Sequence, residues 1–328
     1  MTVNDVQKVN PNVFKTLAWL SWLSNGRQFI VGLVKCDLHV HSYFSGPCTT
    51  PVVRNFCRES YSDPEKIYAV LQDRGMNLFT LTDHDSIDGA EKLRSHSNFF
   101  VSEELTCKMP SGTEVHIGVY DLSDRQHVQL QQRRSDLVAL LMYLTEKRLF
   151  FSINHVFSSV TGRRHIDDFS WFYEYFPAFE IKNSHMLERA NQDAAKLAKQ
   201  WGKIGIGGSD AHALPSVGTA YTEVPGARDK KEFFEGLRNG AGRVAGESGC
   251  FTKLTRDVCV IACEMMREKM WTTALSPLAI LIPGFTFWNY CDERLFSRRW
   301  APQVLRQPES KKRLPWISGP QSVAEEYL

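Results

Sequence analysis

The chain has 328 residues, of which 43% are hydrophobic and 23% charged, and this composition excludes a disordered or fibrous protein. Its formal net charge of +2 provides no strong field for nucleic acid or membrane over the whole molecule, so any preference for anions must be local. The eight cysteines contain no CxxC pair, and we therefore expect reduced thiols and a cytoplasmic protein.

The first element expected in chain order is an N-terminal helix. Phe14 to Leu23 is apolar, but it lacks the basic region and the small-residue cleavage site of a signal peptide. Its two tryptophans have helical spacing. We therefore interpret residues 1–34 as a packed helical extension.

From Gly32 onward, short strand-like runs alternate with helical patterns. In Val34 to His41 the apolar and polar residues alternate, which is typical of a strand with one buried face. Further strand-like runs are Leu78–Thr82, Phe99–Glu104, Val115–Tyr120, Leu149–His155, Ala178–Asn183 and Ile204–Gly208. Helical patterns begin at Asp63-Pro64 and also cover Asp124–Arg148, Leu187–Trp201 and Asp229–Asn239. The alternation predicts βαβ units and a parallel sheet, and Pro110-Ser111-Gly112 predicts a hairpin within it.

After about Gly249 the alternation stops. Thr252 to Met270 has the pattern of an amphipathic helix, and Trp271 to Cys291 then carries no charge over 21 residues. That length is enough to cross a bilayer, but prolines interrupt it, so we expect a buried helix-turn segment. Arg294 to Arg313 holds seven basic residues and one acidic residue. We interpret it as a solvated tail, with docking to a partner or an anionic surface as the alternative.

Histidines and carboxylates gather at the ends of the predicted strands. His39 and His41 are two residues apart in a strand, so their imidazoles share one face and can hold one metal ion. A structural pair of histidines at a polar strand end is the alternative. Other candidates at strand ends or within strands are His84, Glu103, Glu104, His116, His155, Asp210 and His212. Six of the ten histidines therefore fall in or just after predicted strands, which predicts a metal centre.

With these motifs the chain resembles the polymerase and histidinol phosphatase (PHP) family of metal-dependent phosphoesterases. The matching motifs are Asp37-Leu-His-Val-His41-Ser42, Thr82-Asp-His-Asp85, Glu104, His116, Asn154-His155 and Gly208-Ser-Asp-Ala-His212. The resemblance implies an α/β fold, a distorted TIM-like (β/α)7 barrel over residues 35–250. Helical extensions are expected at residues 1–34 and at residues 251–328, where the second includes the basic tail.

The resemblance also implies divalent metal ions, commonly manganese, iron or zinc. It assigns one ion to His39, His41, Glu104 and Asp210, a second to Glu104, His116 and His155, and a third to His84 and His212. Mixed imidazole and carboxylate ligands suit such ions, and two of them can generate a bridging hydroxide that attacks phosphorus. Gly46 stands where the family usually has an aspartate of the third site. We therefore expect two tightly held ions and a third that is weak or missing.

Other residues receive supporting roles. We expect Asp37, Asp83 and Asp85 to orient imidazoles, with solvated acids at strand ends as the alternative. Arg163 and Arg164 are candidates to clamp a substrate phosphate, although surface arginines are common. Glu103 competes with Glu104 for the bridging role, and the family pattern favours Glu104. His84, Asp210 and His212 are the residues that we expect nearest to the reaction.

The sequence therefore predicts a metal-dependent hydrolase of phosphate esters. It would act as a phosphatase or phosphodiesterase on a small phosphorylated metabolite or on an oligonucleotide end. One alternative is an amidohydrolase-type metal hydrolase, and another is a catalytically degenerate PHP barrel that binds partners. No basic stripe interleaved with aromatic residues predicts a nucleic-acid channel. No transmembrane anchor is expected.

Overall fold

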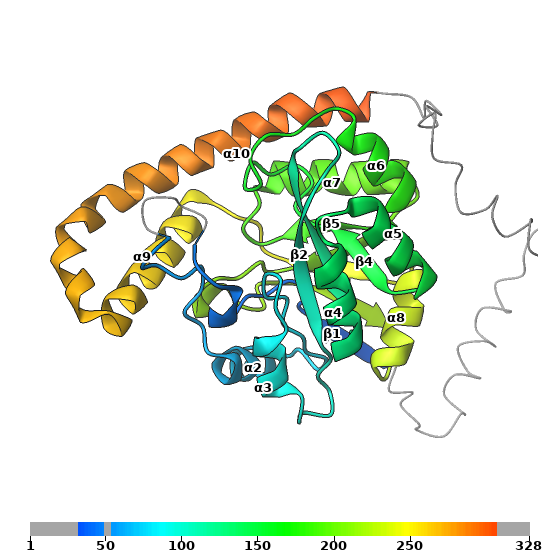
Figure 1. Cartoon of the computed structure of the whole chain (residues 1–328), viewed down its shortest axis with the longest axis horizontal. Coiled ribbons are helices and arrows are strands. Elements are labelled where there is room, and N and C mark those ends of the chain that lie inside the picture. Colours follow the sequence, from blue (N-terminus) through cyan, green and yellow to red (C-terminus); the bar gives the residue numbers. More distant parts are fainter. Residues whose placement is uncertain (1–31, 49–53, 307–328) are drawn as a thin grey trace, which may run out of the picture. The chain divides into compact units, whose positions relative to one another are not determined.

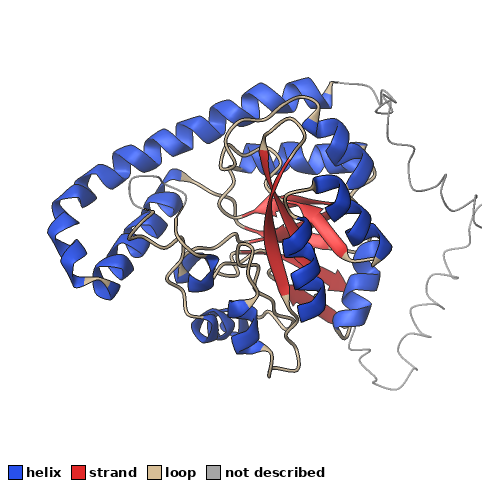
Figure 2. Ribbon diagram, viewed as in Figure 1, coloured by secondary structure: helices blue, strands red, loops and turns tan. Residues whose placement is uncertain are grey.

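The computed structural model describes residues 32–48 and 54–306. The chain divides into two units, Met1–Gly32 and Leu33–Leu328. The predicted N-terminal helix lies outside the described residues. In the second unit, helices cover two β-sheets (Figures 1 and 2).

The strands of the described residues form one small and one larger sheet. The first is antiparallel, with the order β1 (Leu33–Cys36), β7 (Ala220–Pro225) and β8 (Arg243–Gly246). The second has the order β2 (Ser102–Lys108), β3 (Glu114–Tyr120), β4 (Phe150–Ile153), β5 (Ala178–Asn183) and β6 (Ile204–Gly208). Its first two pairings are antiparallel and its last two are parallel. The mixed α/β fold and the predicted hairpin between β2 and β3 are confirmed.

The predicted closed barrel is not confirmed, because strand pairing in the described part of the chain leaves two separate sheets. The run at Leu78–Thr82 forms only an isolated bridge, from Phe79 to Phe99. Single bridges nevertheless connect segments of the two sheets and the loop between them, since Val40 after β1 pairs with Ala211 after β6, and His84 pairs with Glu104 of β2. The segments that carry the candidate ligands therefore lie side by side.

Several helices begin at a residue whose side chain caps the first turn. They are α2 (Pro64–Asp73), α3 (Asp88–Leu93), α4 (Asp124–Arg133), α5 (Leu137–Glu146), α6 (Asp168–Tyr175), α7 (Glu188–Gln200), α8 (Lys230–Arg238), α9 (Phe251–Glu268) and α10 (Ile282–Leu305). The described residues also form three 3-10 helices, η1 (Tyr43–Ser45), η2 (Leu214–Ser216) and η3 (Met270–Leu281). Asp63 accepts hydrogen bonds from two amides of the first turn of α2. The helix predicted over Asp124–Arg148 is two helices, because Asp136 accepts from the Ala139 amide and begins a new one.

The main hydrophobic core lies between the larger sheet and the helices α5, α6 and α7. Ile153 and Phe179 of the sheet are fully buried there, as is Phe172 of α6. Full burial of one such side chain contributes about 1.5–3 kcal/mol. Trp300 and Val304 of α10 belong to the same core. The interpretation of residues from Arg294 onward as a solvated tail is therefore wrong for the part that forms α10.

The buried helix-turn segment predicted over Trp271–Cys291 is also wrong. Most of its side chains are exposed, and Thr272 and Thr286 are its buried residues. The hairpin of α9, η3 and α10 extends beyond the sheets, so its connecting segment has little protein around it (Figure 1). In the described residues, Met270–Leu305 is the one helix long and apolar enough to cross a membrane by length and composition.

Candidate metal centre

Histidines and carboxylates from segments far apart in the sequence converge at one place. The groups whose ligand atoms lie within 4.8 Å of one another are His41, His84 and His212; His39, His41 and Asp210; His39, Glu104 and His155; His84, Glu104 and His116; and His185, Asp210 and His212. The structure thus brings together all eight residues that the sequence predicts as metal ligands. The grouping differs in part, because His84 also joins Glu104 and His116.

Glu104 lies at the centre of the cluster, on β2. Its Oε2 atom is 3.2 Å from Nε2 of His39 and 3.4 Å from Nε2 of His41. Its Oε1 atom is 3.5 Å from Nε2 of His155. Asp210 adds a second carboxylate, with Oδ1 at 3.3 Å from Nε2 of His39. A carboxylate with imidazoles on both of its oxygens has the position of a bridging ligand.

The chain reaches this arrangement through a close approach of two backbones. A Cβ atom at Gly208 would lie 2.4 Å from the amide nitrogen of His39, so only glycine fits there. His155 and Asp210 have φ values of 31° and 53°. Such left-handed conformations cost about 1–3 kcal/mol each in residues other than glycine, and they are concentrated at functional sites.

A hydrogen bond identifies which nitrogen of His39 is protonated. Its Nδ1 atom is 2.8 Å from Oε1 of Glu180, and an ionised carboxylate can only accept, so Nδ1 carries the proton. Nε2 of His39 then directs its lone pair toward the carboxylates of Glu104 and Asp210. Sequence reasoning missed Glu180, although an acid in the otherwise apolar start of β5 was an available signal.

The same reasoning applies to His41. Ser45 donates its hydroxyl proton to Oδ1 of Asp83, so its oxygen accepts from Nδ1 of His41 at 3.0 Å. His212 donates from Nδ1 to the carbonyl oxygen of Asp210 at 2.9 Å. Nε2 of both residues therefore faces into the cluster and would supply its lone pair to a bound metal ion.

These lone pairs have no hydrogen-bond partner. Buried atoms without a partner among the described residues include His39 Nε2, His41 Nε2, His84 Nδ1, Glu104 Oε2, His155 Nδ1 and His212 Nε2. Buried polar atoms are nearly always satisfied in folded proteins. Here imidazole nitrogens and carboxylate oxygens face one another, and either protons on the imidazoles or a metal cation between them relieves this arrangement. The residues thus fit divalent metal ions held by nitrogen and oxygen ligands.

The charges of the cluster lead to the same conclusion. Burial lowers the pKa of His41, but the carboxylates of Asp210 and Glu104 outweigh burial and raise it to about 10. Burial raises the pKa of Glu104, and the nearby imidazoles outweigh it and hold this pKa well below its usual range. Without a metal ion the carboxylates are therefore ionised at neutral pH and the His41 imidazole holds a proton, and a metal ion that binds here would displace this proton.

The three predicted orienting acids contact backbone and hydroxyl groups. Asp37 accepts from the Ser209 amide at 2.7 Å and fixes the loop after β6, and burial raises its pKa to about 6. Asp83 acts on His41 through Ser45. Asp85 accepts from the Thr106 amide. Their hydrogen bonds hold the loops that carry the histidines, and they do not go to the imidazoles directly.

Glu59 is a second acid that sequence reasoning missed. Its Oε2 atom is 3.4 Å from Nε2 of His84, and its Oε1 atom is 3.5 Å from Nε2 of His212. Its amide donates to the carbonyl oxygen of Gly46 at 3.1 Å, so the two positions lie next to each other. His84 and His212 therefore have a carboxylate neighbour that the expected ligands of the third site did not include. Glu59 lies 13 residues after Gly46, the position at which the family usually has an aspartate, so the family pattern does not identify it.

We expect Glu59→Gln to release the outermost ion. A divalent ion beside two neutral imidazoles needs a carboxylate to offset its charge, so the count after exhaustive dialysis should fall from about three ions per chain to about two. Elemental analysis measures the count. Glu91→Gln, an exposed acid paired with Arg94, is the control that should retain all the ions. Equal counts in both variants would rule out Glu59 as a ligand.

Other candidates lie apart from the cluster. Glu103 contacts His127 at 2.9 Å and Gln131 at 2.8 Å, so its carboxylate faces away from Glu104. Arg164 is buried and donates to the carbonyl oxygen of Glu114 at 3.2 Å. These contacts argue against Arg164 as a phosphate clamp. Arg163 is exposed, and its predicted role stays a prediction.

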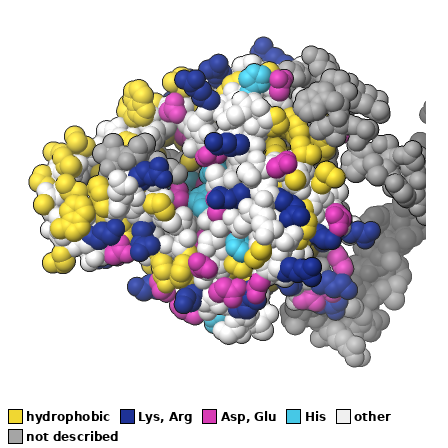
Figure 3. Space-filling model, viewed as in Figure 1, with side chains coloured by type: hydrophobic (Ala, Val, Ile, Leu, Met, Phe, Trp, Pro, Cys, Tyr) yellow, Lys and Arg dark blue, Asp and Glu magenta, His cyan; other side chains and the backbone are white. Residues whose placement is uncertain are grey.

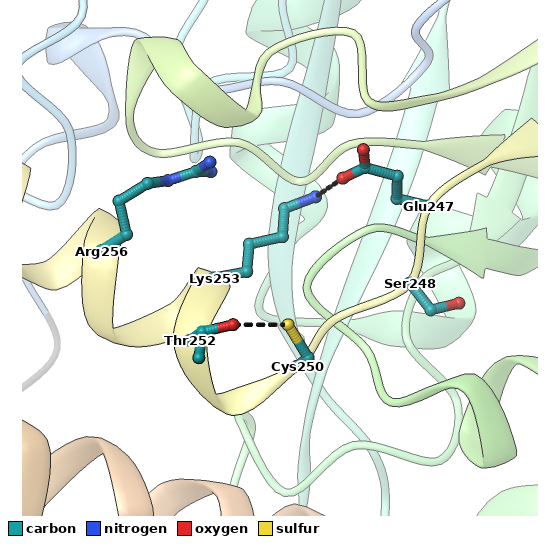
Figure 4. A pocket seen from close by; sticks show the side chains of 6 residues that line it. All are labelled: Glu247, Ser248, Cys250, Thr252, Lys253 and Arg256. Carbon is teal, nitrogen blue, oxygen red and sulfur yellow. Dashed lines mark hydrogen bonds and ion pairs between the residues drawn. The ribbon is translucent and has the colours of Figure 1, made fainter.

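A pocket of about 410 Å³ lies at the start of α9 (Figure 4). It is lined by Glu247, Ser248, Cys250, Thr252, Lys253 and Arg256. Lys253 pairs with Glu247 at 3.3 Å, and its ammonium also donates to Thr219. None of the candidate metal ligands lines this pocket. Asp257, the next residue of α9, lies 2.8 Å from Nε2 of His185. His185 in turn lies beside Asp210 and His212 of the metal centre.

Comparisons with known proteins find one family model and several solved structures that are similar to this chain. Residues 188–241, which contain α7, β6, β7 and α8, match the family model PHP_C, described as PHP-associated. A two-domain protein from Bacteroides vulgatus, which contains a predicted PHP-like metal-dependent phosphoesterase, is 17% identical with a TM-score of 0.53. The match covers 66% of each chain, so this chain spans about two thirds of that structure. At this identity, the likeness shows a shared fold.

Two further structures are more distant. PsfC from Pseudomonas syringae is 15% identical with a TM-score of 0.49, and the match covers 72% of this chain and 99% of that one. An amidohydrolase from Chromobacterium violaceum is 15% identical with a TM-score of 0.39, and the match covers 56% and 89%. No curated protein sequence matches the chain. Residues 188–241 are thus similar to a PHP-associated family model, and the chain shares its fold with a structure that contains a predicted PHP-like phosphoesterase.

Proposed function

We propose that this protein hydrolyses phosphate esters with divalent metal ions held by the cluster around Glu104. The observation that carries the proposal is the set of buried imidazole and carboxylate atoms that face one another without hydrogen-bond partners. Manganese, iron or zinc would suit this set of ligands. When bound, such ions activate a water molecule and neutralise charge on the phosphoryl oxygens.

The candidate ligands divide into a buried inner group and a more exposed outer group. His39, His41 and Glu104 are buried and would hold the inner ions, with His116, His155 and Asp210 completing their ligands. His84, His212 and Glu59 would hold a third. Their side chains are 12%, 19% and 17% exposed, so a phosphate ester would approach from their side. His84, His212 and Asp210 are therefore the residues that we propose nearest to the reacting phosphate.

The proposed substrate is a small phosphorylated metabolite or an oligonucleotide end. One phosphate held by metal ions requires little additional positive charge from the protein. We place the activity in the cytoplasm, on the basis of eight cysteines without CxxC spacing.

Assay of the purified full chain on a substrate panel tests this proposal. The panel contains phosphate monoesters, phosphate diesters, carboxylic esters and amides, each with added manganese, iron or zinc. We expect release of phosphate or of a phosphorylated product, and no turnover of amides. Turnover of amides alone would favour the amidohydrolase-type alternative. A folded chain that binds metal ions and turns over none of the substrates would favour a binding module.

A further inference from the structure

The segment between α9 and the second half of α10 exposes an unusual amount of apolar surface. Residues 270–291 contain no Asp, Glu, Lys or Arg. The side chains of Ile280 and Trp288 are 82% and 73% exposed, and those of Met270 and Trp271 are 75% and 60% exposed. Hydrophobic side chains gather at this end of the molecule (Figure 3). Soluble proteins rarely leave such a patch uncovered, so something else is expected to cover it.

Exposed side chains point in several directions from the segment, although Thr272 and Thr286 are buried, and Thr286 contacts Thr255 of α9. Leu278, Ala279, Ile280 and Leu281 are consecutive and all exposed, and consecutive helical residues point in different directions. A helix that packs on a protein partner has one apolar face and one polar face, whereas a helix that is apolar all round is surrounded by an apolar medium. This pattern favours the hydrocarbon region of a lipid layer over the surface of a second protein.

Both ends of the segment are fixed to the folded core. Oε1 of Glu293 accepts from Oγ of Ser158 at 2.7 Å, and Trp300 packs in the main core. On the other arm, Asp257 of α9 contacts His185. Because both arms return to the same body, the segment cannot cross a bilayer without unfolding the core. It can enter one leaflet from one side.

The flanks of the segment complement an anionic surface. Arg294, Arg298 and Arg299 are exposed on α10 after Asp292 and Glu293, the two acids that end the uncharged segment, and Lys and Arg side chains border the apolar end (Figure 3). Trp271 and Trp288 lie near its two boundaries, and tryptophan is enriched where hydrocarbon meets headgroups. Basic residues beside an apolar helix are attracted to anionic lipids.

We propose that residues 270–291 dock the protein onto an anionic lipid surface by inserting into one leaflet. This inference goes beyond the proposed function and does not depend on it. It assigns the apolar segment to lipid acyl chains and the arginines of α10 to lipid headgroups. The metal centre remains in the part of the protein outside the lipid.

Sedimentation of the full chain with vesicles tests this proposal. One set of vesicles contains phosphatidylcholine and phosphatidylglycerol, and the other contains phosphatidylcholine alone. We expect the native chain to sediment with the anionic vesicles and less with the neutral ones. The double variant Ile280→Glu and Trp288→Glu should bind at least about tenfold less, because charges are strongly disfavoured in hydrocarbon. Both positions are exposed, so the fold should not change.

A matched control uses an exposed apolar residue elsewhere. Met142 of α5 is 68% exposed, and Met142→Glu should leave vesicle binding unchanged. A triple variant with Arg294, Arg298 and Arg299 replaced by glutamine should bind anionic vesicles at least about tenfold less than the native chain does. Its binding to neutral vesicles should change little. Equal sedimentation of the native chain and the double variant would overturn the proposal.

A second copy of the chain is the competing occupant. Analytical ultracentrifugation without lipid distinguishes it, because the proposal expects no oligomer that depends on Ile280 and Trp288. A native dimer that ignores vesicles, and that becomes a monomer in the double variant, would assign the segment to self-association and overturn the proposal.

Discussion

Replacing Glu104 with glutamine is expected to reduce phosphoesterase turnover by about a thousandfold or more, equivalent to several kcal/mol of lost stabilisation of the transition state. The substitution keeps the shape of the side chain and removes the negative charge shared by the imidazoles of His39, His84 and His155. Ions on both sides of Glu104 should then bind more weakly. Turnover under saturating substrate and metal content after dialysis are the two measurements.

The adjacent acid is a matched control for this experiment. Glu103 is equally buried, but its carboxylate contacts His127 and Gln131, outside the cluster. The Glu103→Gln variant should therefore retain all the metal ions of the native chain, and it should also retain most of the turnover. If the two variants lost activity equally while both stayed folded, Glu104 would have no special role.

Removal of the metal ions is expected to lower the thermal midpoint of unfolding by about 10 °C or more. An ion present at a thousandfold excess over its dissociation constant stabilises the folded state by about 4 kcal/mol. In a chain of this size, each kcal/mol shifts the midpoint by roughly 2–4 °C. Without ions, the partnerless atoms of His39, His41 and Glu104 lie buried against one another. Thermal scans with and without a chelator measure the shift, and added manganese should reverse it.

A variant without the inner site shows whether the chelator acts there. Asp210→Asn is suitable, because asparagine tolerates the left-handed backbone at this position better than alanine does. Its midpoint should fall less on addition of the chelator than that of the native chain, because one of the ions has lost a ligand. Identical midpoints for the native chain with and without the chelator would contradict the presence of tightly bound ions.

The sequence predicts the ligands well where they follow local rules. His39, His41 and His116 sit in alternating segments, where the period of two residues decides which side chains share a face. Asp210 and His212 follow a strand, and segments that follow neighbouring strands meet at one edge. Such patterns are readable without knowledge of tertiary contacts.

Glu59 and Glu180 could not be predicted in this way. Glu59 lies outside any regular element, and its role comes from contacts with His84 and His212, which are 25 and 153 residues away. Closure of the barrel was not predictable either, because single bridges replace continuous strand pairing at Phe79 and His84. Apolar composition alone does not show what covers the segment from Trp271 to Cys291.

The side chains of the metal centre differ in their exposure, so metal ions would enter and leave the centre from one side. The side chains of His41 and Glu104 are 0% and 1% exposed, whereas those of Glu59 and His212 are 17% and 19% exposed. On the proposed arrangement of ions, an ion that entered from the exposed side would pass the outer ligands first, and inner ions would leave by the same route. The outer ion would then exchange fastest and shield the inner ones. The metal at the inner positions would be set by the supply when the chain first fills, and later changes in that supply would replace it slowly.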